Sequence, residues 1–309
     1  MAIPQRPTLC TARRRLRWTS GSARRWTAAR ACLTSLSLTG GSTTVSYRER
    51  LERWFGHLPL EVDDLFLLER FQLLALPSRA PLPALGATLA ADPRLRRFLV
   101  ARCPELEPWL GALVDGLDRP TVDLEQRRRT LVWELADWLV YQRFPEAYDQ
   151  IEELRWGTDQ LGEICELEGR TVVDAGSGTG WLSVELARVA DTVFAVEPVT
   201  RLREYIRGRA REVGLNNLYP LDGFLHRVPL PVDSVDVLVT SRAIGWELGA
   251  ELTEIERVVS PGGWAVHFVG TPCDAPRTMV DDTLESRGYT PSRYRDGGGW
   301  RRRYTKRMS

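Results

Sequence analysis

The spacing of apolar residues divides this chain of 309 residues into two regions. Between residue 46 and about residue 165, apolar side chains recur every three or four positions, as on one face of an α-helix. From about residue 170 onward, short runs rich in β-branched residues alternate with stretches of helical spacing. The pattern predicts a helical region followed by a domain of alternating strands and helices.

The helices expected in the first region have recognisable ends. The clearest covers residues 62–76, with two aspartates in its first turn, where the helix dipole favours negative charge, and with Pro77 breaking the chain after it. The Asp-Pro pair at 92–93 is a cap followed by proline at the first helical position. Further helices are expected after Asp123 and over residues 146–165.

The second region predicts a sheet. Four apolar runs indicate strands at residues 171–175, 192–197, 235–240 and 264–270. Helices fit between them at residues 180–190, 200–213 and 248–259. A helix at 275–287 then precedes an antiparallel hairpin around the glycines at 297–299. The predicted fold is α/β, a doubly wound and mostly parallel sheet with an antiparallel C-terminal hairpin, preceded by an all-helical N-terminal region.

Residues 1–45 differ from the rest of the chain. They are rich in Arg, Ser and Thr, and no acidic residue precedes Glu49. Three interpretations stay open: a transit peptide, a nucleic-acid-binding tail, or an upstream stretch included by a misassigned start codon, with translation beginning near Val45. We expect residues 1–45 to be a disordered or misassigned extension, residues 46–145 a helical region serving as a lid or dimerisation surface, and residues 146–309 the α/β domain.

Composition narrows the classes of function. The formal net charge of +1 gives no overall attraction to nucleic acid or acidic membranes, and no apolar run approaches the roughly 20 residues that cross a bilayer. The five cysteines are scattered without a C-x-x-C pair and there are only three histidines, so neither a disulfide framework nor a metal site is expected. Reduced thiols predict a cytoplasmic protein. The use of arginine almost throughout, with Lys306 as the only lysine, is typical of a GC-rich bacterial genome.

The segment VVDAGSGTGWLSVELA, residues 172–187, carries the clearest chemistry. A hydrophobic strand ends at Asp174 and leads into a helix through three glycines at alternate positions, Gly176, Gly178 and Gly180. Such glycines allow a tight turn and let a ligand approach the backbone beyond the carboxyl end of the strand. The dinucleotide fingerprint G-x-G-x-x-G would need glycine where Trp181 stands, which disfavours a nicotinamide cofactor.

This D-x-G-x-G-x-G pattern resembles motif I of the class I, Rossmann-like, S-adenosylmethionine-dependent methyltransferases, and the wider match looks like their small-molecule type, often called type 11. The resemblance implies that S-adenosylmethionine is the cofactor and that Asp174 engages its amino group, directly or through water. Glu197, which closes the second strand, would accept hydrogen bonds from the ribose hydroxyls, as acidic residues also do in NAD sites. The loop around the methionine part of the cofactor would consist of Gly176, Ser177, Gly178 and Gly180.

The stretch DGFLHRVPLPVDSVDVLV, residues 222–239, resembles the family's loop after the third strand and its fourth strand. Gly223 matches the family's glycine, but Phe224 stands where the family has aspartate. The contact to the adenine amino group therefore departs from the pattern. Asp222 or His226 can supply it, and Phe224 either packs on the adenine face or is a core aromatic residue.

The acceptor is expected beyond the fourth strand, where Ser241 would lie beside the cofactor. Methyl transfer from a sulfonium is an in-line displacement, which needs a base only if the acceptor must lose a proton. Arg242 either holds an anionic acceptor or pairs with a carboxylate of the protein. Glu247 and His226 are candidate bases, and Glu247 alternatively only favours a helix N-terminus.

The segment before the first strand often covers the cofactor in this family. Tyr148, Arg155 and Trp156 are therefore candidates for closing over it, with ordinary helix packing as the alternative. The helical region before them forms either a lid over the acceptor or a homodimer surface, and the sequence does not choose between these roles.

Three functions stay open. The favoured one is methyl transfer to a small molecule, with no nucleic-acid or membrane partner. A non-catalytic module that binds S-adenosylmethionine is the second, because of the departure at Phe224. The third is an RNA methyltransferase whose Arg-rich N-terminus and residues 300–307 contact phosphates. Against the third, Arg301 and Arg303 do not share a face with Arg302 on what is expected to be an edge strand.

Overall fold

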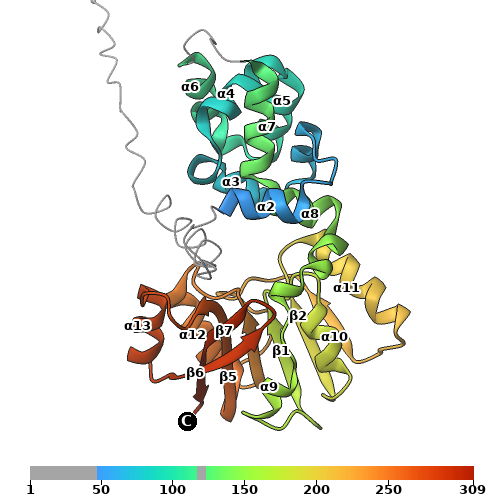
Figure 1. Cartoon of the computed structure of the whole chain (residues 1–309), viewed down its shortest axis with the longest axis vertical. Coiled ribbons are helices and arrows are strands. Elements are labelled where there is room, and N and C mark those ends of the chain that lie inside the picture. Colours follow the sequence, from blue (N-terminus) through green and yellow to red (C-terminus); the bar gives the residue numbers. More distant parts are fainter. Residues whose placement is uncertain (1–46, 117–122) are drawn as a thin grey trace, which may run out of the picture.

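The structure is a computed structural model that describes residues 47–116 and 123–309 (Figure 1). A helical region is stacked on an α/β domain, and the chain passes from the first to the second after α8 (Ala136–Arg143). The predictions for residues 1–45 fall outside the described residues. Within the described ranges, no helix is long and apolar enough to cross a membrane.

The helical region has an apolar core of its own. Buried leucines from five helices meet in it, namely Leu73, Leu85, Leu95, Leu110 and Leu131. Because each short helix buries one apolar face against the others, the region packs without help from the sheet. Its elements besides α8 are α2 (Tyr47–Phe55), η1 (Val62–Leu67), α3 (Arg70–Arg79), α4 (Leu82–Ala91), α5 (Pro93–Arg102), η2 (Pro104–Leu106), α6 (Glu107–Asp115) and α7 (Leu124–Glu134).

The prediction of one helix over residues 62–76 is wrong, because the chain is divided after η1. Leu68 adopts an extended backbone with ψ 138°. A capping box then starts α3: the Glu69 backbone N–H donates to Gln72 Oε1 at 2.9 Å, and the Glu69 side chain accepts from the backbone in return. The hydrophobic spacing runs across this break, so spacing alone could not reveal it.

The prediction that Pro77 ends this helix is also wrong, since α3 continues to Arg79. Proline removes one N–H donor and crowds the carbonyl four residues earlier, but it does not prevent the following residues from completing the last turn of a helix. The last turn is still closed, because the Ala80 N–H donates to Leu76 O at 2.9 Å.

The helix predicted over residues 146–165 is wrong as well. The segment forms η3 (Pro145–Gln150), η4 (Glu152–Leu154) and α9 (Asp159–Gly162), with an extended Arg155 between the last two. Its side chains bind distant elements instead of their helical neighbours; Asp149, for example, accepts hydrogen bonds from Thr179 and Tyr205. These tertiary contacts override the helical spacing.

The predicted sheet is confirmed. Seven strands lie in the order β3-β2-β1-β4-β5-β7-β6, parallel except for the pairs that β7 makes. β3, which the apolar runs did not indicate, is a four-residue edge strand containing Pro220. Proline is tolerated at an edge because no neighbour needs its N–H. The strands are β1 (Thr171–Ala175), β2 (Thr192–Val196), β3 (Leu218–Leu221), β4 (Val235–Ser241), β5 (Val259–Pro272), β6 (Thr290–Asp296) and β7 (Gly299–Arg307).

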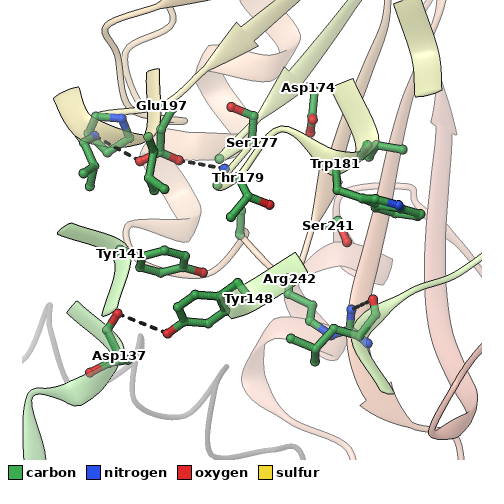
Figure 2. A pocket seen from close by; sticks show the side chains of 18 of the residues that line it. Asp137, Tyr141, Tyr148, Asp174, Ser177, Thr179, Trp181, Glu197, Ser241 and Arg242 are labelled. Atoms are coloured by element: carbon green, nitrogen blue, oxygen red, sulfur yellow. Dashed lines mark hydrogen bonds between the residues drawn. The ribbon is translucent and has the colours of Figure 1, made fainter. Parts of the chain in front are cut away.

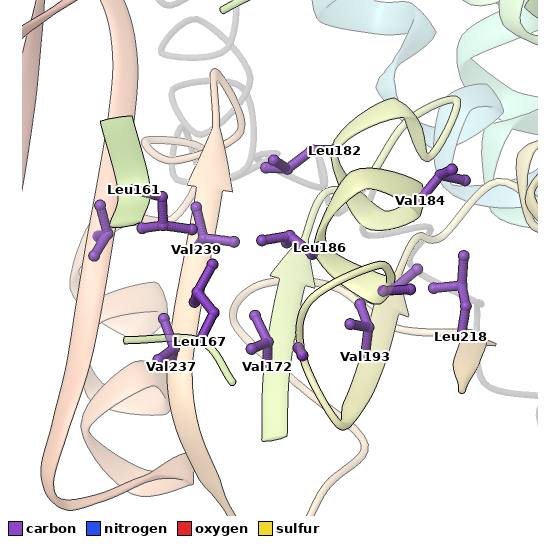
Figure 3. Close-up of a cluster of buried hydrophobic side chains, with 14 of the residues drawn as sticks. Leu161, Leu167, Val172, Leu182, Val184, Leu186, Val193, Leu218, Val237 and Val239 are labelled. Atoms are coloured by element: carbon purple, nitrogen blue, oxygen red, sulfur yellow. The ribbon is translucent and has the colours of Figure 1, made fainter. Parts of the chain in front are cut away.

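Helices cover both faces of the sheet, so alternate residues of a strand enter different cores. Val172 of β1 packs with Leu186 of α10 (Trp181–Ala187), and Figure 3 shows this face. Its neighbour Val173 packs in the opposite cluster with Leu252 of α12 (Leu248–Val258). Burial on both sides explains why β1 is a continuous apolar run. The remaining helices of this domain are α11 (Thr200–Glu212) and α13 (Met279–Ser286).

The C-terminal hairpin forms as predicted, but β7 is not an edge strand. It lies between β5 and β6, so the edge of the sheet is β6. Two arginines of β7 consequently pair with acids of the protein: Arg301 is 2% exposed and pairs with Asp296 at 3.1 Å, and Arg302 pairs with Asp281 at 2.8 Å.

The cap at the start of α5 gives a testable prediction for the helical region. Asp92 accepts hydrogen bonds from the backbone N–H groups of Arg94 at 2.9 Å and Leu95 at 3.4 Å. Asp92→Ala should therefore lower the free energy of unfolding by about 1 kcal/mol in urea denaturation followed by circular dichroism. The matched variant Asp115→Ala removes an exposed aspartate at the end of α6 and should not destabilise. Equal stability of the two variants would contradict the capping role of Asp92.

Candidate active site

A cavity of about 280 Å³ lies between the two regions of the chain. Its floor is the edge of the sheet at the carboxyl ends of β1, β2 and β4, and its roof comes from α2, α3, α8 and η3. The strand order reverses between β1 and β4, and ligands of open α/β sheets bind at such a switch point. Figure 2 shows residues of both regions facing the same space.

The loop after β1 depends on glycine. Gly176, Gly178 and Gly180 have φ angles of 72°, 54° and 71°, in the left-handed region that side chains disfavour. A Cβ on Gly176 would also lie 2.3 Å from the Ala243 Cβ. The loop leaves one polar atom unpaired within the described chain, the buried Ser177 Oγ. A polar ligand group reaching the loop would satisfy this hydroxyl.

Asp174 is the second-last residue of β1, just before this loop, and is 1% exposed. Ser183 Oγ of α10 donates to its Oδ2 at 2.6 Å. Burial raises the pKa of Asp174 to about 7, although this hydrogen bond opposes the rise.

Glu197 follows β2 and binds the loop from the other side. Its two oxygens accept from the Gly178 N–H at 2.9 Å and the Val199 N–H at 3.0 Å. Burial raises the pKa of Glu197 to about 7 against the effect of these two bonds. Within the described chain neither Glu197 nor Asp174 forms an ion pair, so a cationic or hydroxyl-rich ligand would complement both.

Aromatic rings gather where the adenine was predicted. Phe224 makes an edge contact with Phe71 of α3, with ring centroids 5.2 Å apart, and stacks with His226 at 5.2 Å. Gly223 is required beside them, since a Cβ there would lie 2.8 Å from Pro229 Cδ. Gly223, Phe224 and His226 all line the cavity.

Asp222 is separated from this group. Its side chain is 73% exposed, and Arg203 Nη1 holds it at 3.1 Å outside the cavity. The structure thus brings His226, but not Asp222, to the place where the adenine contact was expected.

Of the residues predicted for the acceptor side, at the end of β4 and after it, some line the cavity and others do not. Ser241 and Arg242 line the cavity, whereas Glu247 is the N-cap residue of α12 and does not. Ser241 Oγ accepts from Trp156 Nε1 at 3.2 Å. Arg242 donates to Leu154 O at 2.8 Å and pairs with the buried Asp296. Of the two interpretations of Arg242, the structure therefore agrees with the one in which it pairs with a carboxylate of the protein.

Glu251 was missed by the sequence analysis. It lines the cavity, is 1% exposed, and accepts from the N–H groups of Gly245 at 2.7 Å, Trp246 at 2.9 Å and Glu247 at 2.9 Å. A signal for it exists in the sequence: it stands on the apolar face of α12, between Leu248 and Leu252. Its role in the structure is to fix the loop between β4 and α12.

The segment before β1 does reach the cavity, and two of the three residues singled out in it beforehand line the cavity. Tyr148 and Arg155 line it, whereas Trp156 is buried against Phe268 at 3.8 Å. Tyr141 of α8 was missed; it also lines the cavity and stacks on Tyr148 with ring centroids 4.0 Å apart.

Asp149, also missed, joins this segment to the cofactor half of the cavity. It accepts hydrogen bonds from Thr179 Oγ1 at 2.7 Å, Tyr205 OH at 2.9 Å and Arg209 Nη1 at 3.0 Å. No group of three or more His, Cys, Asp or Glu in the described part of the chain is arranged to hold a metal ion.

Residues 173–267 match a family model described as a methyltransferase domain. The predicted class I, S-adenosylmethionine-dependent methyltransferase domain is thereby confirmed, and with it S-adenosylmethionine as the cofactor of this class. The match begins in β1 and ends in β5, so it includes the glycine loop, Glu197 and the loop after β4.

Individual relatives each match part of this chain. The chain is 34% identical to a malonyl-[acyl-carrier protein] O-methyltransferase of Yersinia pestis, over 40% of this chain and 46% of that protein. It is 29% identical to a protein-L-isoaspartate O-methyltransferase of Photobacterium profundum, over 34% of this chain and 52% of that protein. A solved methyltransferase structure from Aquifex aeolicus is 20% identical, with a TM-score of 0.44, over 53% of this chain and 98% of that chain. The chain thus spans about half the length of the two curated relatives.

The raised pKa values predict how cofactor binding depends on pH. Near pH 7 the free site still holds protons on Asp174 and Glu197, whose pKa values are about 7. A bound cation favours the ionised carboxylates, so binding releases protons and the affinity rises with pH. Between pH 6 and pH 8 the association constant for S-adenosylmethionine should rise about ten- to hundredfold.

Isothermal titration calorimetry in buffers of different ionisation enthalpy measures both the affinity and the released protons. In the double variant Asp174→Asn, Glu197→Gln the residual pH dependence should be only that of the ligand. An affinity of the unmodified protein that stays constant or falls over this range would show that the two carboxylates do not bind the cofactor as ions.

Proposed function

We propose that this protein transfers the methyl group of S-adenosylmethionine to a small molecule enclosed between the α/β domain and the helical region. The observation that carries the proposal is the pair of buried carboxylates, Asp174 and Glu197, on either side of the left-handed glycine loop. They face a cavity roofed by another part of the chain, as expected for a site that excludes water from the reaction.

The residues present fit the cofactor. Asp174 and the unpaired Ser177 hydroxyl suit its amino-acid part, Glu197 suits the ribose hydroxyls, and Phe224 with His226 offers rings beside the adenine. When bound, S-adenosylmethionine supplies a methyl group whose bond to sulfur breaks, leaving its electron pair on sulfur, as the acceptor's lone pair bonds to the methyl carbon.

The chain contributes mainly positioning. The glycine loop and Glu197 fix one reactant, and the roof residues enclose the other, so the two meet in a fixed geometry. His226 lines the cavity, and its imidazole can take a proton from an acceptor that must lose one. We assign Arg242 to positioning, because its bonds to Leu154 O and Asp296 hold the roof segment against β6.

The placement of the C-terminal arginines favours a small molecule over RNA. Arg301 and Arg303 are 2% and 8% exposed, and Arg302 pairs with Asp281. Phosphate contacts need exposed cations, and Arg307 is the exposed basic residue of residues 300–307, so this stretch offers less basic surface than the RNA alternative requires. The Arg-rich stretch before residue 46 lies outside the described residues.

Replacing Glu197 tests the cofactor site. Glu197→Gln keeps the size of the side chain but removes its charge, and should weaken S-adenosylhomocysteine binding about tenfold or more, as expected for a lost charge-assisted hydrogen bond. The matched variant Asp191→Asn changes an exposed acid at the opposite end of β2 and should bind normally. Titration calorimetry of both variants, with NAD as a second ligand, gives the comparison.

Binding of NAD in preference to the adenosyl ligand, or equal affinities of the two variants, would refute the assigned cofactor site. Transfer of a labelled methyl group to a small acceptor then separates an enzyme from the non-catalytic alternative. An intact cofactor site with no transfer to any member of a broad acceptor panel, proteins and RNA included, would favour the non-catalytic module.

A further inference from the structure

The wall of the cavity opposite the cofactor-binding residues is aromatic. Figure 2 shows Tyr141 and Tyr148 across the space from Glu197 and Ser177. Three further aromatic residues that line the cavity come from α2 and α8 of the helical region. We call this set the aromatic wall; it consists of Tyr47, Trp54, Trp138, Tyr141 and Tyr148.

The arginines that line the cavity are engaged by the protein itself. Arg242 pairs with Asp296 and donates to Leu154 O, and Arg155 donates to the backbone oxygen of Asp149. An anionic acceptor would have to displace these partners, and breaking a buried pair leaves an uncompensated charge. The cavity is therefore poorly suited to a carboxylate or phosphate.

A cationic acceptor is disfavoured for a related reason. Asp137, an acid that lines the cavity beside Trp138, already accepts from Arg79 Nη2 at 2.8 Å and 2.9 Å. The Arg79 guanidinium also lies 5.8 Å from the Tyr47 ring centroid and 5.6 Å from that of Trp138. Because these rings already interact with a buried cation, a second positive charge beside them would be repelled.

The Tyr141 hydroxyl is a polar group of the wall that remains available. It has no hydrogen-bond partner in the described structure and points into the cavity (Figure 2). Burial raises the pKa of Tyr141, so its phenol stays protonated and can donate at neutral pH. It would pair with an oxygen of a ligand that otherwise contacts only rings.

We propose, building on the methyltransferase function above, that the acceptor is an uncharged, largely apolar, planar molecule carrying a hydroxyl or carbonyl oxygen. The aromatic wall stacks on its plane, and the Tyr141 hydroxyl donates to its oxygen. The helical region, which lies mostly outside the matched methyltransferase domain, thereby determines which acceptor enters.

A series of probes that share one ring system but differ in charge tests this inference. Naphthol, naphthoate and naphthyltrimethylammonium are titrated at pH 7 into the full chain by calorimetry, with and without saturating S-adenosylhomocysteine. Naphthol should bind at least about tenfold more tightly than either charged probe. A charged probe that binds as tightly as naphthol, or no binding of naphthol, would overturn the inference.

Two variants locate the binding. Trp138→Leu should weaken naphthol binding about fivefold or more and leave S-adenosylhomocysteine binding unchanged. The matched variant Trp109→Leu changes another half-buried tryptophan packed on the same core but off the cavity, and should bind naphthol normally. Tyr141→Phe keeps the ring and should weaken naphthol binding about threefold, which is the effect of losing one hydrogen bond.

The outcomes separate the two proposals. Normal binding of S-adenosylhomocysteine without a preference for naphthol would refute only the acceptor class. If S-adenosylhomocysteine does not bind, the proposed function is refuted. The relative affinities of the three probes, measured without S-adenosylhomocysteine, would still test what the cavity binds. Equal naphthol affinities for Trp138→Leu and Trp109→Leu would show that naphthol does not bind at the aromatic wall, and this would contradict the inference.

Discussion

Two carboxylates buried side by side without a cation are the constraint around which the rest of the site is arranged. Asp174 and Glu197 lie at the carboxyl ends of adjacent parallel strands, where their charges would cost several kcal/mol each if left unsolvated. The fold reduces this cost with backbone N–H groups and the Ser183 hydroxyl, and it leaves both pKa values near 7. Such an arrangement is poor for stability but leaves two groups ready for a ligand that brings positive charge.

The glycine loop makes this arrangement possible. With a Cβ at Gly176 the loop could not pass Ala243, and with one at Gly180 it would strike Ile206. The same close approach presents the Gly178 N–H to Glu197. The segment between α8 and β1 then closes the site through polar contacts, chiefly those of Asp149 with the loop and α11.

Much of the α/β domain was predictable, because its signals are local. The glycine spacing, the apolar strand runs and the acid after β2 each reflect a backbone need within a few residues. The helices before β1 were less predictable. The 62–76 stretch keeps its hydrophobic spacing across a break set by the capping box at Glu69. The conformation of the 146–165 stretch depends on hydrogen-bond partners of Asp149 that lie 30 or more positions away. The pairing of Arg242 with Asp296 spans 54 positions, and no local pattern reports it. Tyr141 and Glu251 look like ordinary helix residues until the fold directs them to the cavity.

A crystal structure of the full chain grown with S-adenosylhomocysteine is the most direct test of the central claim. The account predicts the ligand between the glycine loop and the roof, with its ribose hydroxyls on Glu197, its amino group near Asp174 and its adenine beside Phe224. A ligand bound outside this cavity, or one whose ribose does not meet Glu197, would contradict it.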